Sequence, residues 1–157
     1  MRYIFIGTAL LIFLFSGCDI KNEERIYRLI IENESGMDIR LEIFNVADNS
    51  FVKNIDIANS DYLTKDFQSS DMGEVYGIQD LFEGDSINII YGSDLRVERY
   101  RCEFLNPENN GCNKPGNIAN DGDPKWQRQQ DENLFQATYT FTVADFENAE
   151  LCEGDCN

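Results

Sequence analysis

Apolar and polar residues alternate with a period of two in three stretches of the chain. In residues 39–43 isoleucine and leucine alternate with arginine and glutamate, and residues 51–57 repeat the pattern. Residues 135–143 show it most clearly, with Phe, Ala, Tyr, Phe and Val at every second position. This period places one face of a strand in the core and the other in water. Each stretch therefore predicts a half-buried β-strand.

Further strands are predicted where β-branched and aromatic residues lie between turn residues. Residues 26–31 are rich in isoleucine, and the polar turn 32–36 predicts that they form a hairpin with 39–43. Residues 86–91 and 95–102 flank Gly92-Ser93-Asp94 and predict a second hairpin. A short strand is expected near residues 63–67. Residues 144–149 predict one helical turn, capped by Thr142 and Asp145.

About seven short strands with almost no helical period predict an all-β domain over residues 26–157. We expect a single antiparallel β-sandwich or a barrel-like domain with long loops. The immunoglobulin pattern of a core tryptophan between two bonded cysteines is absent. Residues 106–130 are dominated by Asn, Gly, Asp, Pro and Lys and predict a long exposed loop.

The amino terminus has the pattern of a cleaved signal peptide, assigned to residues 1–17. Met1-Arg2 is positive, residues 3–15 are apolar or small, and Ser16-Gly17 supplies small residues beside a cleavage site. As a helix, residues 3–15 would span roughly 20 Å, which is short of the ~30 Å hydrocarbon core of a bilayer. A permanent transmembrane span is therefore the weaker interpretation. An ordinary secreted protein, cut near Gly17, is the other alternative.

Ser16, Gly17 and Cys18 resemble the last three positions of the bacterial lipobox, with Phe15 where leucine is usual. The resemblance implies that Cys18 is lipidated and becomes the first residue, anchoring the mature protein to a membrane. Residues 18–25 would then form an acidic tether. Lys21 and the glutamates after it resemble the export signal of Bacteroidetes-type surface lipoproteins, although a plain charged tether explains them equally well.

The export signal implies an outer-membrane location, lipid-anchored and facing the cell surface, with a periplasmic orientation as the alternative. In other bacterial groups Asp19, beside the lipidated cysteine, would instead retain the protein in the inner membrane. The whole layout resembles small uncharacterised Bacteroidetes-type lipoproteins, in which one cysteine-stapled β domain follows the signal peptide. That resemblance implies a place in the cell envelope and no activity.

The net charge of the chain restricts the classes of partner that it can bind. The formal net charge is −16, and removal of Arg2 with the signal peptide leaves −17. Such a surface repels phosphate backbones, so nucleic-acid binding is not expected. The acidity most simply keeps a membrane-tethered domain soluble.

Four cysteines remain after Cys18, and an even number in an exported chain predicts two disulfides. Sequence alone allows three connectivities. The spacing favours Cys102 with Cys112 and Cys152 with Cys156. A zinc site made of all four thiolates is the rival, but separations of ten and four residues do not match paired C-x-x-C motifs.

The sequence offers few residues that could form a catalytic, metal or ligand-binding site. The chain contains no histidine, which removes the commonest catalytic base and zinc ligand. Asn117, Asp121 and Asp123 form an oxygen-rich cluster that could hold Ca²⁺, with a solvated turn as the simpler interpretation. Trp126 either packs the long loop down or joins tyrosines 62, 76, 91 and 100 in an aromatic binding surface, although strand tyrosines usually belong to the core.

These observations predict a non-enzymatic envelope domain that binds a protein or glycan partner or has a structural role, with no cofactor beyond a possible Ca²⁺. Two alternatives remain. The first is a hydrolase or other enzyme that uses carboxylates in the long loop. The second is a protease-inhibitor or immunity-type protein that presents the loop between Cys102 and Cys112.

Overall fold

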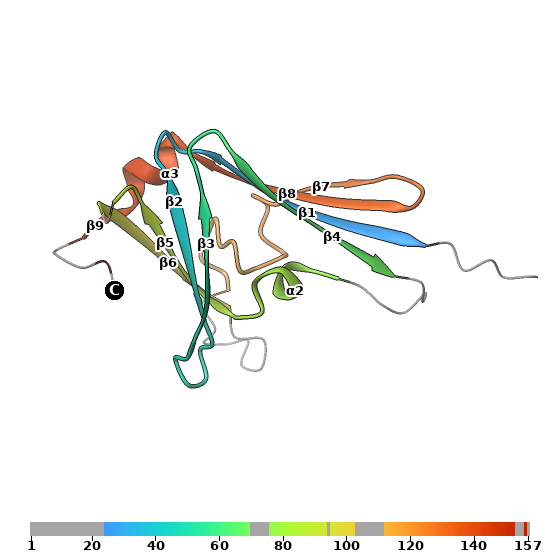
Figure 1. Ribbon diagram of the computed structural model, residues 1–157, viewed down its shortest axis with the longest axis horizontal. Helices are drawn as coiled ribbons and strands as arrows, with labels where there is room; N and C mark the ends of the chain where they lie inside the picture. Colours follow the sequence, from blue (N-terminus) through green and yellow to red (C-terminus); the bar gives the residue numbers. More distant parts are fainter. Residues whose placement is uncertain (1–23, 70–75, 94, 103–111, 153–155, 157) are drawn as a thin grey trace, which may run out of the picture.

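Two β-sheets pack face to face in the computed structural model, which describes residues 24–69, 76–93, 95–102, 112–152 and 156 (Figure 1). The first sheet has the strand order β4-β1-β8-β7: Tyr62–Ser69, Arg25–Glu34, Leu134–Thr142 and Gln127–Gln130. The second has the order β3-β2-β5-β6-β9: Phe51–Ile57, Ile39–Phe44, Ser86–Tyr91, Arg96–Arg101 and Glu150–Leu151. Two short helices, α2 (Ile78–Phe82) and α3 (Val143–Asn148), follow β4 and β8.

The fold class predicted from the sequence is confirmed as an all-β sandwich, and the sheets do not close into a barrel. One pair of strands departs from antiparallel order. β1 runs parallel to β8, with Tyr27 opposite Phe135 and Ile31 opposite Tyr139. This pairing joins the beginning of the domain to a strand near its end, so it has no local trace in the sequence.

The core forms where the inner faces of the two sheets meet. The alternating positions of the predicted strands supply it, as period two requires. Fully buried apolar residues at this interface include Ile31, Tyr139 and Phe141 from the first sheet and Leu41, Ile43, Ile87, Ile89 and Tyr91 from the second.

The predicted hairpin of residues 26–31 with 39–43 is wrong, because β1 and β2 lie in different sheets. The segment between them crosses from one sheet to the other. Asn33, fully buried, holds this crossing: its Nδ2 donates to the carbonyls of Met37 (2.8 Å), Ile57 (3.0 Å) and Ala58 (3.1 Å). A polar turn residue therefore joins two sheet-to-sheet connections instead of closing a hairpin.

The other local predictions agree with the structure. β5 and β6 pair as the expected hairpin, and β3 and β4 occupy the predicted stretches. α3 begins at the predicted cap, where the backbone N–H and hydroxyl of Thr142 both donate to Asp145 Oδ2, at 2.7 and 2.8 Å. Helix α2 and strands β7 and β9 were not predicted.

The prediction of an exposed loop over residues 106–130 is wrong for its described part. Residues 112–126 fold as successive turns against the core, and β7 follows. Ile118 is fully buried, and Trp126 is 3 % exposed. The indole Nε1 donates to the carbonyl of Ile118 at 3.2 Å, and the ring lies 5.2 Å from that of Tyr139. These apolar anchors pin a polar segment to the sandwich.

Both predicted disulfides are present, Cys102–Cys112 and Cys152–Cys156. The first closes the segment between β6 and the folded turns. The second lies on the outer face of the five-stranded sheet, where Cys156 packs against Ile90 and Val97. Cys18, the signal peptide and nearly all of the tether lie outside the described residues. Among the residues that the structure describes, no helix has the length and apolar character needed to cross a bilayer.

Candidate functional site

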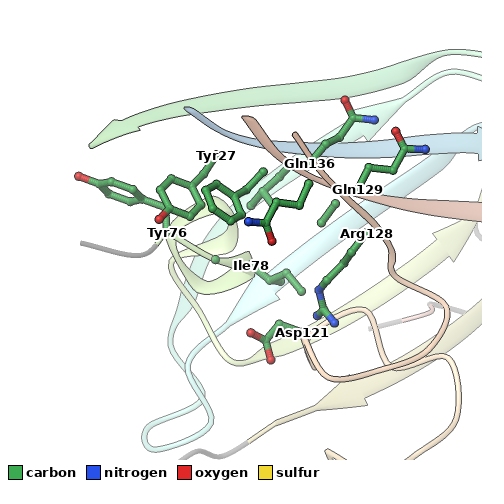
Figure 2. Close-up of a pocket in the computed structure, with 12 residues that line it drawn as sticks. Tyr27, Tyr76, Ile78, Asp121, Arg128, Gln129 and Gln136 are labelled. Atoms are coloured by element: carbon green, nitrogen blue, oxygen red, sulfur yellow. The ribbon is translucent and has the colours of Figure 1, made fainter. Parts of the chain in front are cut away.

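The main candidate site is a groove of about 440 Å³ beneath the open end of the four-stranded sheet (Figure 2). In Figure 1 the ends of β1, β4, β7 and β8 extend beyond the second sheet, and α2 lies below them. Among the described strands, none of the second sheet therefore covers the inner face of the first sheet at this end. The lining residues are Tyr27, Leu29, Tyr76, Gly77, Ile78, Asp121, Arg128, Gln129, Gln130, Phe135, Gln136 and Ala137.

Aromatic rings line one end of the groove. The ring of Tyr27 stacks on that of Phe135, with centroids 5.1 Å apart and planes 13° apart. Tyr76 meets Tyr27 edge-on at 5.9 Å and stacks on Phe67 at 5.1 Å. Offset-stacked and edge-to-face contacts of this kind hold aromatic rings in fixed orientations. The result is a rigid apolar wall built from β1, β4, β8 and the segment before α2.

Polar groups lie at the other end of the groove. The register of β7 with β8 puts Arg128 beside Ala137 and Gln130 beside Phe135, so both point toward the inner face. Figure 2 shows Arg128 extending toward the side of the groove where Asp121 lies, whereas Gln129 and Gln136 lie on the far side of the strands. None of the salt bridges between described residues uses Arg128. Its guanidinium and the Gln130 amide supply exposed hydrogen-bond donors at this end of the groove.

The aromatic residues named from the sequence separate into three groups. Trp126, Tyr91 and Tyr100 belong to the buried core. Burial raises the pKa of the Tyr91 and Tyr100 hydroxyls well above the usual range. Tyr62 is 65 % exposed on β4, away from the groove lining. Only Tyr76 of the five lines the groove, so the predicted surface around Trp126 does not form.

The predicted calcium ligands serve other purposes or lie apart. Asp123 Oδ2 accepts the backbone N–H of Asn117 at 3.2 Å, and its Oδ1 accepts that of Lys125 at 2.8 Å. Asn117 Oδ1 accepts the N–H of Ala119 at 2.9 Å. Asp121 is exposed and lines the groove instead. These oxygens shape the turns, and within the described segments no three acidic or cysteine side chains gather around a common point. The geometry gives the calcium prediction no support.

The groove also gives little support to the hydrolase alternative. Glycosidases place two carboxylates about 5 to 9 Å apart around the scissile bond. Asp121 is the one carboxylate among the described lining residues. What this arrangement can do is hold a ligand by apolar stacking and a few hydrogen bonds.

Sequence reasoning did not find Tyr27 and Phe135 as site residues. Both occupy inward positions of predicted strands, which is the ordinary pattern of a core residue. What distinguishes them in the folded chain is that both also line the groove. Comparison with known proteins adds no relative: no protein-family model matches the chain, and no curated protein matches it significantly.

Proposed function

We infer that this protein is a lipid-anchored, non-enzymatic domain of the cell envelope that binds a saccharide in the groove beneath β1 and β8. The observation that carries the proposal is the stacked pair Tyr27 and Phe135 in the lining of the groove, with Arg128 and Gln130 at the same inner face. Sugars present a flat C–H face and a rim of hydroxyl groups. Aromatic rings complement that face, and guanidinium and amide groups complement the rim.

The size of the cavity agrees with this class of ligand. A volume of about 440 Å³ lies in the range of small-molecule sites, which run from roughly 300 to 1,000 Å³. A short oligosaccharide segment therefore suits it better than a folded partner surface. The surrounding −16 charge disfavours polyanionic ligands at this site, because Arg128 is the only cation of its described lining.

Anchoring through Cys18 forms the second part of the proposal. Two or three acyl chains would make attachment effectively permanent, because each buried methylene contributes about 0.8 kcal/mol. The lipobox-like residues support lipidation, and Lys21 with the following glutamates supports an outer-membrane, surface-facing location. Two disulfides agree with an oxidising compartment outside the cytoplasm.

The ligand is tested with the detergent-solubilised protein on an array of bacterial and host glycans, followed by titration of the best binder. Tyr76→Ala should weaken binding, because it removes a ring from the groove wall. Tyr62→Ala is the matched control, since it removes an exposed tyrosine from the same sheet outside the groove. Equal affinities for the two variants, or no binder on the array, would reject the saccharide site.

The anchor is tested separately in cells of the natural host. Wild type should incorporate labelled palmitate and fractionate with the outer membrane, and Cys18→Ser should do neither. Protease treatment of intact cells then reports which face of the membrane carries the domain. Palmitate labelling that persists in Cys18→Ser would show that the lipid is attached elsewhere.

A further inference from the structure

A second groove, of about 480 Å³, lies on the outer face of the five-stranded sheet. Its lining residues are Glu42, Phe44, Asn49, Phe51, Ser86, Asn88, Arg99 and Arg101. They come from β2, β5, β6 and the β2–β3 connection with the first residue of β3. This face is opposite to the core and separate from the groove beneath β1 and β8.

The strand register arranges the outer-face residues in two rows. One row is Phe44, Ser86 and Arg101; the next is Glu42, Asn88 and Arg99. Adjacent strands are about 4.8 Å apart, so Phe44 and Arg101 stand about 10 Å apart with the small Ser86 between them. The short serine side chain leaves a hollow, flanked by an aromatic group on one side and a guanidinium on the other.

Three charged side chains line this groove: Glu42, Arg99 and Arg101. Arg101 is exposed, and its side chain forms no ion pair or hydrogen bond with the described part of the chain. Arg99 Nη1 lies 3.5 Å from Glu150, and its Nη2 donates to the carbonyl of Cys156 at 3.1 Å. Glu42 is 8 % exposed and lies 3.2 Å from Arg40. Arg99 is therefore partly engaged, and Arg101 offers the guanidinium on this strand face that is best placed to receive a carboxylate in a chain of net charge −16.

The aromatic side of the groove is unusually exposed. Phe51 is 56 % exposed and packs edge-to-face on Phe44, with ring centroids 5.7 Å apart. A ring that is held in place and open to water can stack on a flat apolar ligand surface. Asn49 and Asn88 add amides that donate and accept hydrogen bonds.

We propose that this outer groove binds an acidic saccharide, with its carboxylate at Arg101 and Arg99, its ring on Phe51, and its hydroxyls at Asn88 and Glu42. The carboxylate of Glu42 selects among anions. It accepts hydrogen bonds from hydroxyl groups but repels a carboxylate placed directly beside it. A uronic acid sugar supplies one carboxylate and several hydroxyls per unit, whereas an acidic peptide supplies carboxylates without hydroxyls.

The test is titration of the detergent-solubilised protein with three probes: trigalacturonate, the neutral trisaccharide of galactose, and hexaglutamate. Trigalacturonate should bind, with little binding of the other two at this groove. Arg101→Gln should weaken trigalacturonate binding at least about tenfold, because it removes a charge-assisted hydrogen bond. Phe51→Ala should weaken it about fivefold through lost stacking.

Two control variants match these changes. Arg25→Gln removes one positive charge from the four-stranded sheet, and Tyr62→Ala removes an exposed aromatic ring from β4. Both should bind trigalacturonate like wild type. The proposal is overturned if trigalacturonate does not bind, if Arg101→Gln or Phe51→Ala binds it as wild type does, or if hexaglutamate binds equally well. Tyr76→Ala changes the groove beneath β1 and β8 and leaves the outer groove intact. Binding of trigalacturonate to this variant therefore tests the outer groove separately from the first site.

Discussion

The rings of Tyr27 and Phe135 stack across the parallel pair of β1 and β8, with centroids 5.1 Å apart and planes 13° apart. The two residues are register partners at the end of the sheet that the second sheet does not cover. Their packing serves the fold, because it ties the first strand to the last long one. The same two rings line the groove, where Phe135 is half-buried and Tyr27 is 6 % exposed.

Phe135→Leu separates the stabilising role of this ring from its binding role. Leucine keeps an apolar side chain of similar size, so the free energy of unfolding should fall by less than about 1.5 kcal/mol. Leucine lacks a flat face, and saccharide affinity should fall about fivefold. Urea unfolding and calorimetric titration measure the two quantities. Unchanged affinity would mean that the ring does not contact the ligand.

Trp126→Ala should cost about 3 to 5 kcal/mol, because it leaves a cavity where the indole packs on Tyr139. Trp126→Phe is the matched variant, since it keeps an aromatic ring and loses the hydrogen bond to the Ile118 carbonyl. Its cost should be nearer 1 kcal/mol. Chemical unfolding of both variants checks the order. A cost below 1 kcal/mol for Trp126→Ala would mean that the turns of residues 112–126 are not anchored there.

Asn33→Leu should destabilise the fold by at least about 3 kcal/mol. The substitution removes the donor for three carbonyls at the two crossings between sheets and leaves one buried carbonyl and two part-buried ones without that partner. Asn113→Leu changes an exposed asparagine and should stay within about 0.5 kcal/mol of wild type. Thermal and urea unfolding compare them. A similar stability for both would contradict the role given to Asn33.

Asp145 predicts a specific pH dependence of stability. Burial raises the pKa of Asp145, but hydrogen bonds from Lys125 and Thr142 outweigh burial and hold that pKa below its usual range. The carboxylate therefore stabilises the fold above the unfolded pKa, near 3.9, and this contribution disappears as the pH falls through the folded pKa.

Asp145→Asn should lower stability by about 1 kcal/mol at pH 7, through the weakened helix cap and the lost contact with Lys125 at 2.6 Å. The difference from wild type should shrink at pH 2.5. Asp66→Asn, which breaks a more exposed ion pair with Arg28, should have a smaller effect at pH 7. Urea unfolding at both pH values measures this. A stability difference between Asp145→Asn and wild type that grows at low pH would contradict this role of the carboxylate.

Local patterns predicted the strands because a half-buried strand displays its faces directly in sequence. β2, β3, β5 and β8 each showed period two or a run of β-branched residues between turns. The cap of α3 also depends on residues only three positions apart. Helix α2 was not predicted, because five residues are too few to show a helical period. Strand β7, with the sequence QRQQ, has no apolar alternation to detect.

Contacts between segments that lie far apart in the sequence could not be predicted from local patterns. Whether the turn after β1 closes a hairpin or crosses between sheets depends on the carbonyls near Ile57 that bind Asn33. The turns of residues 112–126 looked exposed because polar side chains dominate them, yet Asn117 and Asp123 use their oxygens to bind backbone N–H groups. The groove combines segments around residues 27, 76, 128 and 135, which only the folded chain brings together.

The saccharide site can be located directly by backbone amide NMR of the detergent-solubilised protein as ligand is added. Binding in the groove should shift the amide signals of residues 76–78, 127–130 and 135–137 at low ligand concentrations, and leave those of β3 and β9 unchanged. The Tyr76→Ala variant should need a higher ligand concentration for the same shifts. Saturable shifts confined to other surfaces, or none with any saccharide on the array, would contradict the proposed function.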